Sequence, residues 1–169
     1  MLFVLLGPSG SGKTTQAEKL AELPHFHKII TATTRPPRPS EKDGRDYYFL
    51  SDTGYDEKLK RGELLAPTQI HGARYGIPKE DLLALAQSNH RHGVVVLDDL
   101  GAKELRALGA IAIALTLPEA ERHRRLERRK EKGRFQREET DFIADDTLSS
   151  EGDVEDVFCH LKNCVEKYL

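Results

Sequence analysis

The chain alternates short apolar runs with segments whose apolar residues recur at helical spacing. The apolar runs have the length and composition of strands buried on both faces of a parallel sheet, and they cover residues 2–6, 94–97 and 111–115. The helical segments that follow them cover residues 14–23, 101–108 and about 118–132. Buried strands that alternate with helices are typical of a doubly wound parallel α/β sheet, and this is the fold class that we expect.

Weaker patterns complete this core. We expect a second strand at residues 28–32, a helix at about 78–88 with Pro78 in its first turn, and a last short strand at 142–144. Residues 149–167 have the spacing of an amphipathic C-terminal helix. Its apolar face is expected to consist of Val154, Val157, Phe158, Leu161 and Val165.

One long insert, residues 33–77, interrupts the alternation. Three prolines exclude regular structure from residues 33–40. After them we expect strands at 47–50, 64–70 and 75–77 and a short helix at 52–61, with Pro67 restricting its strand to an edge position. Short turns between these strands predict a small, mostly antiparallel lobe beside the carboxyl edge of the main sheet, where ligands bind in open α/β folds.

The first apolar run leads directly into the sequence Gly-Pro-Ser-Gly-Ser-Gly-Lys-Thr at residues 7–14. This G-x-x-x-x-G-K-[ST] pattern is typical of the P-loop, in which backbone N–H groups and a helix N-terminus bind phosphates. A plain glycine-rich turn would not require the lysine and the threonine. We expect Lys13 to reach the β- and γ-phosphates of a nucleoside triphosphate and Thr14 to ligate Mg²⁺. The candidate nucleotide-binding residues here are Gly7, Ser9, Gly10, Ser11, Gly12, Lys13, Thr14 and Thr15.

Composition narrows the class of protein. The 169 residues suffice for one domain with a real core, and the net charge of −2 argues against general binding to nucleic acids or membrane surfaces. No apolar run approaches the roughly 20 residues that cross a bilayer, and the apolar N-terminus is too short for a signal peptide. Cys159 and Cys164 have no metal or redox spacing, which favours a reducing cytoplasm.

Arg35 and Arg38 lie in the proline-stiffened loop, and Tyr47 and Tyr48 follow them. Arginine binds phosphate with two parallel hydrogen bonds, and a stiff loop loses little entropy when it binds. The alternative is a solvated basic loop. The P-loop already predicts a phosphate partner, so we favour an anion clamp.

Asp98 directly follows the apolar run at residues 94–97. In P-loop enzymes an acid at this place lies near Mg²⁺ and the phosphates. Asp98 and Asp99 have the equally simple alternative of capping the following turn. We favour a functional role for Asp98.

Arginines crowd the segment from residue 122 to residue 137. Such a run is usually a solvated helix face with ion pairs between residues four apart. Phosphoryl transfer, however, builds up negative charge between two phosphates, and a mobile arginine-bearing lid neutralises it. We expect two or three of these arginines to serve this purpose.

In this order, the motifs resemble the guanylate kinase family from residue 2 to about residue 149. The resemblance rests on the P-loop, on Thr-Thr-Arg-Pro-Pro-Arg-Pro at 33–39, and on Asp-Gly-Arg-Asp-Tyr-Tyr-Phe at 43–49. It continues with Tyr-Gly at 75–76, Val-Leu-Asp at 96–98, Arg-Leu-Glu-Arg-Arg at 125–129 and Asp-Asp at 145–146.

The resemblance implies one P-loop domain, with a core at residues 1–32 and 78–169, an acceptor-binding lobe at about 33–77 and a short lid at about 125–141. It implies transfer of the γ-phosphate of MgATP to GMP, with ATP and Mg²⁺ as cofactors and only small molecules as partners. Implied ligands of the acceptor are Thr31, Arg35, Arg38, Tyr47, Tyr75 and Asp98, the last also a candidate Mg²⁺ ligand. Arg125 and Arg129 are implied on the ATP side, Arg134 or Arg137 as the lid arginine, and the catalytic set is Lys13, Arg129, Arg134 and Arg137.

The chain departs from the family pattern at several positions. Ala66 and Ile77 stand where family members read guanine with a carboxylate and a hydroxyl, and neither side chain can form a hydrogen bond to a base. Eleven residues separate Arg129 from Asp141, so the lid is short, and Ala144 replaces a usual asparagine. Two alternatives to a GMP kinase therefore stay open. One is a different phosphorylated acceptor, either another nucleotide or a sugar phosphate. The other is a non-catalytic binding module, against which the presence of Lys13 argues.

Overall fold

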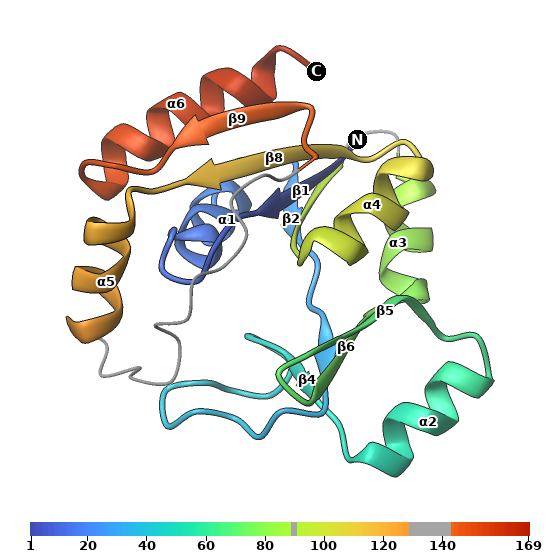
Figure 1. Ribbon diagram of the computed structural model, residues 1–169. Coiled ribbons are helices and arrows are strands. Elements are labelled where there is room, and N and C mark those ends of the chain that lie inside the picture. Colours follow the sequence, from blue (N-terminus) through green and yellow to red (C-terminus); the bar gives the residue numbers. More distant parts are fainter. Residues whose placement is uncertain (89–90, 129–142) are drawn as a thin grey trace.

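The computed structural model describes residues 1–88, 91–128 and 143–169, and its core is a five-stranded parallel sheet (Figure 1). The strands lie in the order β2 (Phe26–Lys28), β7 (His92–Val96), β1 (Leu2–Leu6), β8 (Ile111–Thr116) and β9 (Asp146–Ser149). Every neighbouring pair in this sheet is parallel. The predicted doubly wound parallel sheet is confirmed.

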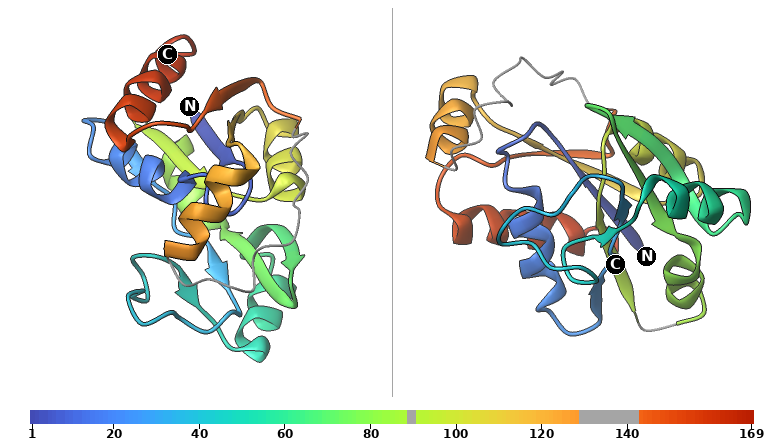
Figure 2. Two further views of the ribbon diagram at one scale, coloured as in Figure 1. Left: turned by 60° about the vertical axis from the view of Figure 1, so that its left-hand side comes forward. Right: turned by 90° about the horizontal axis from the view of Figure 1, so that it is seen from below.

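Helices cover both faces of this sheet. Alternate residues of β1 point to opposite faces, so that Phe3 and Leu5 belong to one apolar cluster and Val4 and Leu6 to another. The first cluster lies under α1 (Lys13–Ala21) and α6 (Val154–Glu166), and the second lies under α4 (Asp99–Ala107). Figure 2 separates these helices on the two sides of the strands. The two layers place the carboxyl ends of β1, β7 and β8 at one edge.

The insert forms a second, four-stranded sheet in the order β4 (Tyr48–Phe49), β3 (Ala32–Thr33), β6 (Ala73–Pro78) and β5 (Leu64–Ile70). β3 pairs with β4 in parallel and with β6 antiparallel, and β5 pairs with β6 antiparallel. Helix α2 (Asp52–Lys60) packs on it through Tyr55, whose hydroxyl donates to the Tyr75 carbonyl at 2.6 Å. The predicted mostly antiparallel lobe is confirmed, with Pro67 on the edge strand.

The single strand expected at residues 28–32 is wrong. The chain leaves the core sheet after Lys28 and enters the sheet of the lobe at Ala32. Ile29 still donates its N–H to the Val94 carbonyl at 2.8 Å, so the crossing takes only the two following residues. Apolar residues continue through the crossing, because this segment is buried where the two sheets meet, and the pattern alone reads as one strand.

The strand expected at residues 142–144 is also wrong. Residue 142 lies outside the described residues, Ile143 is exposed, and the strand is β9, four residues later. Its sequence Asp-Thr-Leu-Ser is mostly polar, because β9 is an edge strand that pairs through its backbone with β8. The pattern of apolar residues therefore gives no sign of β9.

The C-terminal helix begins five residues later than expected. Asp153 caps it by accepting from the N–H groups of Glu155 and Asp156, both at 2.9 Å, so α6 starts at Val154. Val157, Leu161 and Val165 are buried as predicted, whereas Val154 is exposed. Helix α5 (Glu119–Arg128) follows β8, and the rest of the helix expected to about residue 132 lies outside the described residues. Helix α3 (Lys79–Ala86) follows β6.

Asp145 joins α4 to the start of β8 and β9. Its carboxylate accepts from Arg106 Nε at 3.0 Å, from Arg106 Nη2 at 2.6 Å and from the Ala112 N–H at 2.8 Å. The hydrogen bonds of Arg106 lower the pKa of Asp145, and the Ala112 N–H acts in the same direction. The ionised carboxylate is therefore more stable in the folded chain than in the unfolded chain.

Asp145→Asn is expected to lower the free energy of unfolding at pH 7 by about 1–3 kcal/mol, because the guanidinium loses a charged acceptor. Because the pKa of Asp145 is lowered in the folded chain, its ionised carboxylate stabilises the fold at pH values above its ordinary pKa of about 4. This stabilisation is lost as the pH falls through the pKa that the group has in the folded chain. The difference between wild type and variant in urea denaturation should thus shrink in acid. Exposed Glu151→Gln is the control, and an equal loss in that variant would contradict the assignment.

Candidate functional site

The loop between β1 and α1 has the backbone that its glycines predict. Gly7, Gly10 and Gly12 have φ of 144°, 87° and 86°. A Cβ at Gly7 would clash with the Leu115 carbonyl oxygen, so the neighbouring strand β8 also excludes a side chain there. The Ser11 N–H donates to the Pro8 carbonyl at 3.1 Å and closes the turn into α1. The loop is therefore held as a compact ring of amides at the N-terminus of a helix, which is suited to bind an anion.

Lys13 places its charge over this loop. Its Nζ donates to the Gly7 carbonyl at 2.6 Å and to the Pro8 carbonyl at 2.8 Å. These contacts bend the side chain back across the ring instead of letting it extend into solvent. The ammonium group thus lies where a phosphate held by the loop amides would meet it.

Hydroxyl groups complete the loop. Ser11 is buried and, among the described residues, its Oγ has no hydrogen-bond partner, which leaves a polar atom inside the ring. Thr14 is exposed in the first turn of α1, while Ser9 and Thr15 are half-buried. The described residues contain no cluster of three His, Cys, Asp or Glu side chains able to hold a metal. A Mg²⁺ ion that arrives with phosphates needs only one or two protein oxygens, and the Thr14 hydroxyl fits that need.

Helix α5 packs directly over the loop. A Cβ at Gly10 would lie 3.4 Å from Leu126, and one at Gly12 would lie 4.0 Å from Arg125 Nη1. Arg125 Nη2 donates to the Ser150 carbonyl at 2.7 Å, so the guanidinium bridges α5 and the segment that follows β9. The structure therefore brings Arg125 to the P-loop, and its role on the ATP side stays a prediction.

Arg122 is a buried residue that the sequence did not single out. It is 1% exposed, and Glu119 accepts from its Nε at 3.0 Å and from its Nη2 at 2.7 Å. The stem of this side chain packs near Gly10. The only signal in the sequence is a glutamate three residues earlier, which does not distinguish a buried pair from an exposed one. The other arginines predicted to act, Arg129, Arg134 and Arg137, lie outside the described residues, as does most of the expected lid.

A second charged cluster forms in the lobe around Arg35. Its guanidinium lies over the ring of Tyr47 at 5.3 Å and the ring of Phe49 at 5.8 Å, and the rings of Tyr47 and Tyr75 are 6.2 Å apart. Burial raises the pKa of Tyr47, so its hydroxyl stays a neutral hydrogen-bond donor. Three of the predicted acceptor ligands are thus brought together, Arg35 and Tyr47 from the loop before β4 and Tyr75 from β6.

The partner of Arg35 is Glu41, a residue that the sequence does not indicate. Glu41 accepts from Arg35 Nη1 at 2.9 Å and from Nη2 at 2.8 Å, and its Oε2 accepts from the Arg38 N–H at 2.8 Å. Arg35 and Glu41 are six residues apart in an irregular loop, and no helix or strand periodicity pairs residues at that spacing. The backbone of Arg38 is therefore part of the same cluster, and its side chain is half-buried. Thr31 is buried and accepts from the Tyr48 N–H at 2.9 Å through its carbonyl.

Asp98 adopts the alternative role of a helix cap. Its Oδ1 accepts from the Gly101 N–H at 2.7 Å and begins α4. The second oxygen of the carboxylate makes no described hydrogen bond. The cap fixes Asp98 at the carboxyl end of β7, the edge at which ligands bind in this fold class.

Ala66 and Ile77 belong to the apolar core. They are 2% and 0% exposed and lie in the cluster that packs between the lobe and α4. Ala66 has φ of 48° at a bulge in β5, and its N–H donates to Glu104 Oε1 of α4 at 3.0 Å. Glu104 is a polar contact between core and lobe that the sequence did not indicate.

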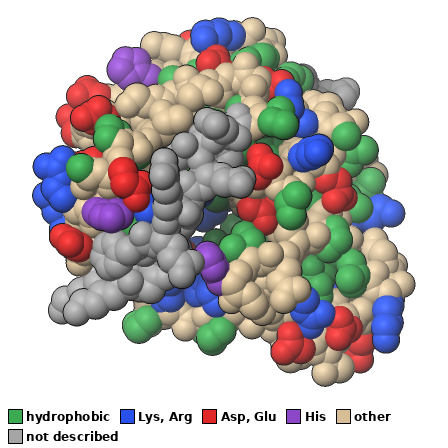
Figure 3. Space-filling model, viewed as in Figure 1, with side chains coloured by type: hydrophobic (Ala, Val, Ile, Leu, Met, Phe, Trp, Pro, Cys, Tyr) green, Lys and Arg blue, Asp and Glu red, His purple; other side chains and the backbone are tan. Residues whose placement is uncertain are grey.

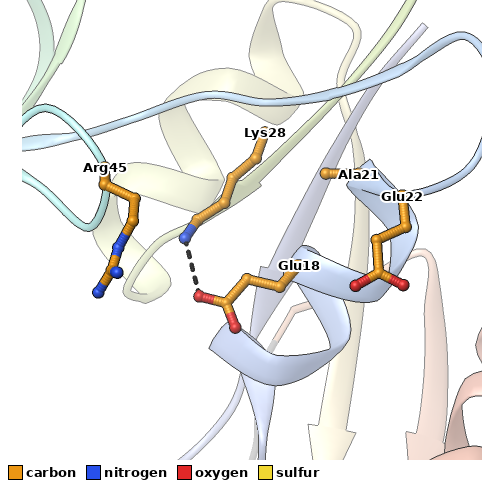
Figure 4. Close-up of a pocket in the computed structure, with 5 residues that line it drawn as sticks. All are labelled: Glu18, Ala21, Glu22, Lys28 and Arg45. Atoms are coloured by element: carbon orange, nitrogen blue, oxygen red, sulfur yellow. Dashed lines mark hydrogen bonds and ion pairs between the residues drawn. The ribbon is translucent and has the colours of Figure 1, made fainter.

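The space-filling view is hollowed between the core and the lobe, with acidic side chains along one rim (Figure 3). A separate mixed-charge hollow lies beside the C-terminal turns of α1 (Figure 4). Its lining includes Glu18, Lys28 and Arg45, with Lys28 Nζ 3.3 Å from Glu18 Oε1. None of its lining residues belongs to the P-loop or to the Arg35 cluster. Over the described ranges, no helix has both the length and the apolar character to cross a membrane.

Known proteins place this arrangement in a family. The sequence model described as guanylate kinase matches residues 1–168. The chain is 39% identical over 120 residues to a guanylate kinase of Nostoc sp., covering 70% of this chain and 56% of that protein. It is 36% identical over 142 residues to one of Chlamydia felis, covering 82% and 69%.

The fold agrees with a solved structure. The crystal structure of guanylate kinase from Anaplasma phagocytophilum superimposes with a TM-score of 0.77 at 24% identity, covering 99% of this chain and 85% of that one. The chain spans about half to two thirds of the length of the curated relatives that it matches. On the match across nearly all of its residues, the chain belongs to the guanylate kinase family.

Proposed function

We propose that the protein transfers the γ-phosphoryl group of MgATP to the phosphate of GMP, with ADP and GDP as products. The observation that carries the proposal is the presence, in one chain of this family, of two anion sites of different construction. One is the P-loop with Lys13 bent over it, and the other is the arginine–tyrosine cluster around Arg35. A kinase that transfers a phosphoryl group from one phosphorylated molecule to another needs an anion site for each of them.

The roles follow from charge. The attacking oxygen of the acceptor phosphate is ionised at neutral pH, so the chain needs no general base, and catalysis consists of in-line positioning and charge neutralisation. The loop amides, Lys13 and Arg125 would hold the ATP phosphates. Mg²⁺, bound with ATP and reached by Thr14, would supply further positive charge. Arg35, Arg38, Tyr47 and Tyr75 would hold the acceptor phosphate, with Thr31 and Asp98 nearby.

The rest of the expected organisation belongs to the same proposal. Residues 33–77 would form the acceptor-binding lobe, and residues 125–141 would form the lid, with Arg129 and either Arg134 or Arg137 meeting the transferred group. The small-molecule substrates and the unpaired Cys159 and Cys164 support work in a reducing cytoplasm.

A different phosphorylated acceptor is the second candidate. Its support is the apolar, buried character of Ala66 and Ile77, which offer no hydrogen bond to a base. A site that reads its substrate by hydrogen bonds rejects analogues strongly, so losing such groups broadens or changes the choice.

The test is ADP formation from MgATP with GMP, dGMP, AMP, CMP, UMP, dTMP, IMP and several sugar phosphates. We expect GMP to be preferred. Preference for another member of the panel would support the second candidate, and the absence of any acceptor-dependent ADP formation would contradict both. A binding module without turnover would also give this last result.

A further inference from the structure

We propose that Glu41 is a positioning residue, which holds the Arg35 guanidinium and its loop in the geometry that binds the acceptor phosphate. The proposal rests on the proposed function in that it concerns the same acceptor site. It assigns a role to a carboxylate that would otherwise look like a competitor of the phosphate.

Glu41 is the centre of the irregular loop. Its carboxylate accepts from both terminal nitrogens of Arg35 and from the Arg38 N–H, and the Glu41 N–H donates to the Arg38 carbonyl at 3.0 Å. The side chains of Arg35 and Glu41 are only 17% and 13% exposed. Although burial opposes both charges, the hydrogen bonds between the two residues lower the pKa of Glu41 and raise that of Arg35. The pair is thus ionised, and one side chain connects two candidate phosphate ligands.

The pairing leaves a defined edge of the guanidinium for a ligand. Glu41 uses the edge formed by Nη1 and Nη2, and the second Nη1 hydrogen donates to the Pro36 carbonyl at 2.9 Å. A planar guanidinium has a further edge, formed by Nε and the second Nη2 hydrogen, which points away from the first. The rings of Tyr47 and Phe49 fix the plane of the Arg35 guanidinium, and the Tyr75 side chain also acts on this guanidinium and favours its charged form. A phosphate at the second edge would meet an arginine that is already oriented.

Orientation matters because an arginine side chain has many rotamers, which a ligand would otherwise have to restrict on binding. Residues 35–46 belong to no helix or named strand, and apart from an isolated bridge between Asp43 and Tyr47 their backbone hydrogen bonds to one another are those of local turns. Glu41 supplies the restraint before the acceptor arrives. A competing carboxylate would have the opposite effect, so the sign of the change on removing Glu41 separates the two roles.

The lobe contains a matched control on β6. Arg74 lies next to Tyr75 in the strand, and its guanidinium is 4.6 Å from the ring of Tyr55. Asp56 and Asp52 of α2 are its acceptors. Successive side chains of a strand point to opposite faces, so this arginine, aromatic and carboxylate group repeats the chemistry of Arg35 away from the clamp. Asp56→Ala removes a carboxylate of the same kind.

The experiment measures acceptor KM, ATP KM and calorimetric GMP affinity for wild type, Glu41→Ala, Glu41→Gln and Asp56→Ala. Glu41→Ala is expected to weaken acceptor binding and raise acceptor KM by about 10–100-fold, the usual effect of losing hydrogen bonds to a charged group. ATP KM should stay within about twofold, because the P-loop is untouched. Glu41→Gln keeps one acceptor oxygen and should recover part of the loss, while Asp56→Ala should match wild type.

An unchanged or lower acceptor KM in Glu41→Ala would overturn the proposal, as would equal changes in acceptor KM and ATP KM. A double variant with Arg35→Lys should lose little more than Arg35→Lys alone, because both changes remove one arrangement. If Glu41→Ala does not fold, Glu41→Gln carries the comparison.

Failure of the proposed function would give a different result, because the wild-type protein would then turn over no acceptor in the panel. Binding of inorganic phosphate, followed by the NMR ring signals of Tyr47 and Tyr75, then still tests Glu41 without turnover. Weaker phosphate binding in Glu41→Ala supports the positioning role, and equal or tighter binding rejects it.

Discussion

Lys13→Ala is expected to reduce acceptor-dependent ADP formation by about 10³-fold, at the upper end of what removal of one electrostatic contact to a transition state costs. The Lys13 ammonium lies across the P-loop, held by the carbonyls of Gly7 and Pro8. No neighbouring cation on α1 replaces it, because Lys19 pairs with Glu155 on the side of the helix that faces α6. Without Lys13, the loop amides, Arg125, Mg²⁺ and the proposed lid arginines would have to balance the charge that develops on the transferred phosphate.

The measurement is steady-state ADP formation with GMP, together with the free energy of unfolding. Lys19→Ala is the matched control, a lysine of the same helix whose partners are Glu155 and the ring of Phe158. It should retain activity within about twofold of wild type. Unchanged turnover in a folded Lys13→Ala protein would contradict every kinase role for this chain. A chain that binds partners without turnover would show no difference between the two variants.

Most of the core could be predicted because its signal is local. β1, β7 and β8 are apolar on both faces, so their residues stand out without any knowledge of their neighbours. β9 could not be found in this way, since its strand is specified by the free edge of β8 and its own side chains are mostly polar. The strand expected at 28–32 failed for a related reason, because an apolar run cannot tell which of two sheets each residue joins.

In the candidate site, too, the residues of a local motif could be predicted and the residues that depend on packing could not. The P-loop is one contiguous motif in which each residue's task follows from its neighbours, and the structure places the glycines and Lys13 accordingly. Glu41 and Glu104 act through partners that only the folded chain brings close, and Arg122 pairs with Glu119 of its own helix but is buried by packing between segments. In each case the sequence contains the charged residue but no spacing that distinguishes a buried pair from a solvated one. Burial depends on packing between segments, and that is what the structure adds.

The burial that the structure adds to the sequence has its largest consequence at Ile77. Its side chain is fully buried, on a strand residue that pairs with Leu65, inside the cluster shared by the lobe and α4. Ile77→Ser is therefore expected to lower the free energy of unfolding by about 3–5 kcal/mol, because it opens a cavity and buries a hydroxyl. Ile77→Val, which removes one methyl group, should cost about 0.5–1.5 kcal/mol. Urea denaturation of both variants measures these losses.

The same pair of variants bears on the choice of acceptor. If Ile77 is a core residue, Ile77→Ser loses stability and gains no preference for GMP at a temperature where it is folded. A stable Ile77→Ser that uses GMP better would mean that this position lines the acceptor site in the working enzyme. Ala66→Glu is the less direct test, because it places a carboxylate at a buried residue with φ of 48° whose N–H already binds Glu104. The serine variant therefore decides whether the loss of hydrogen-bonding groups at this position reflects packing between lobe and core or a changed acceptor.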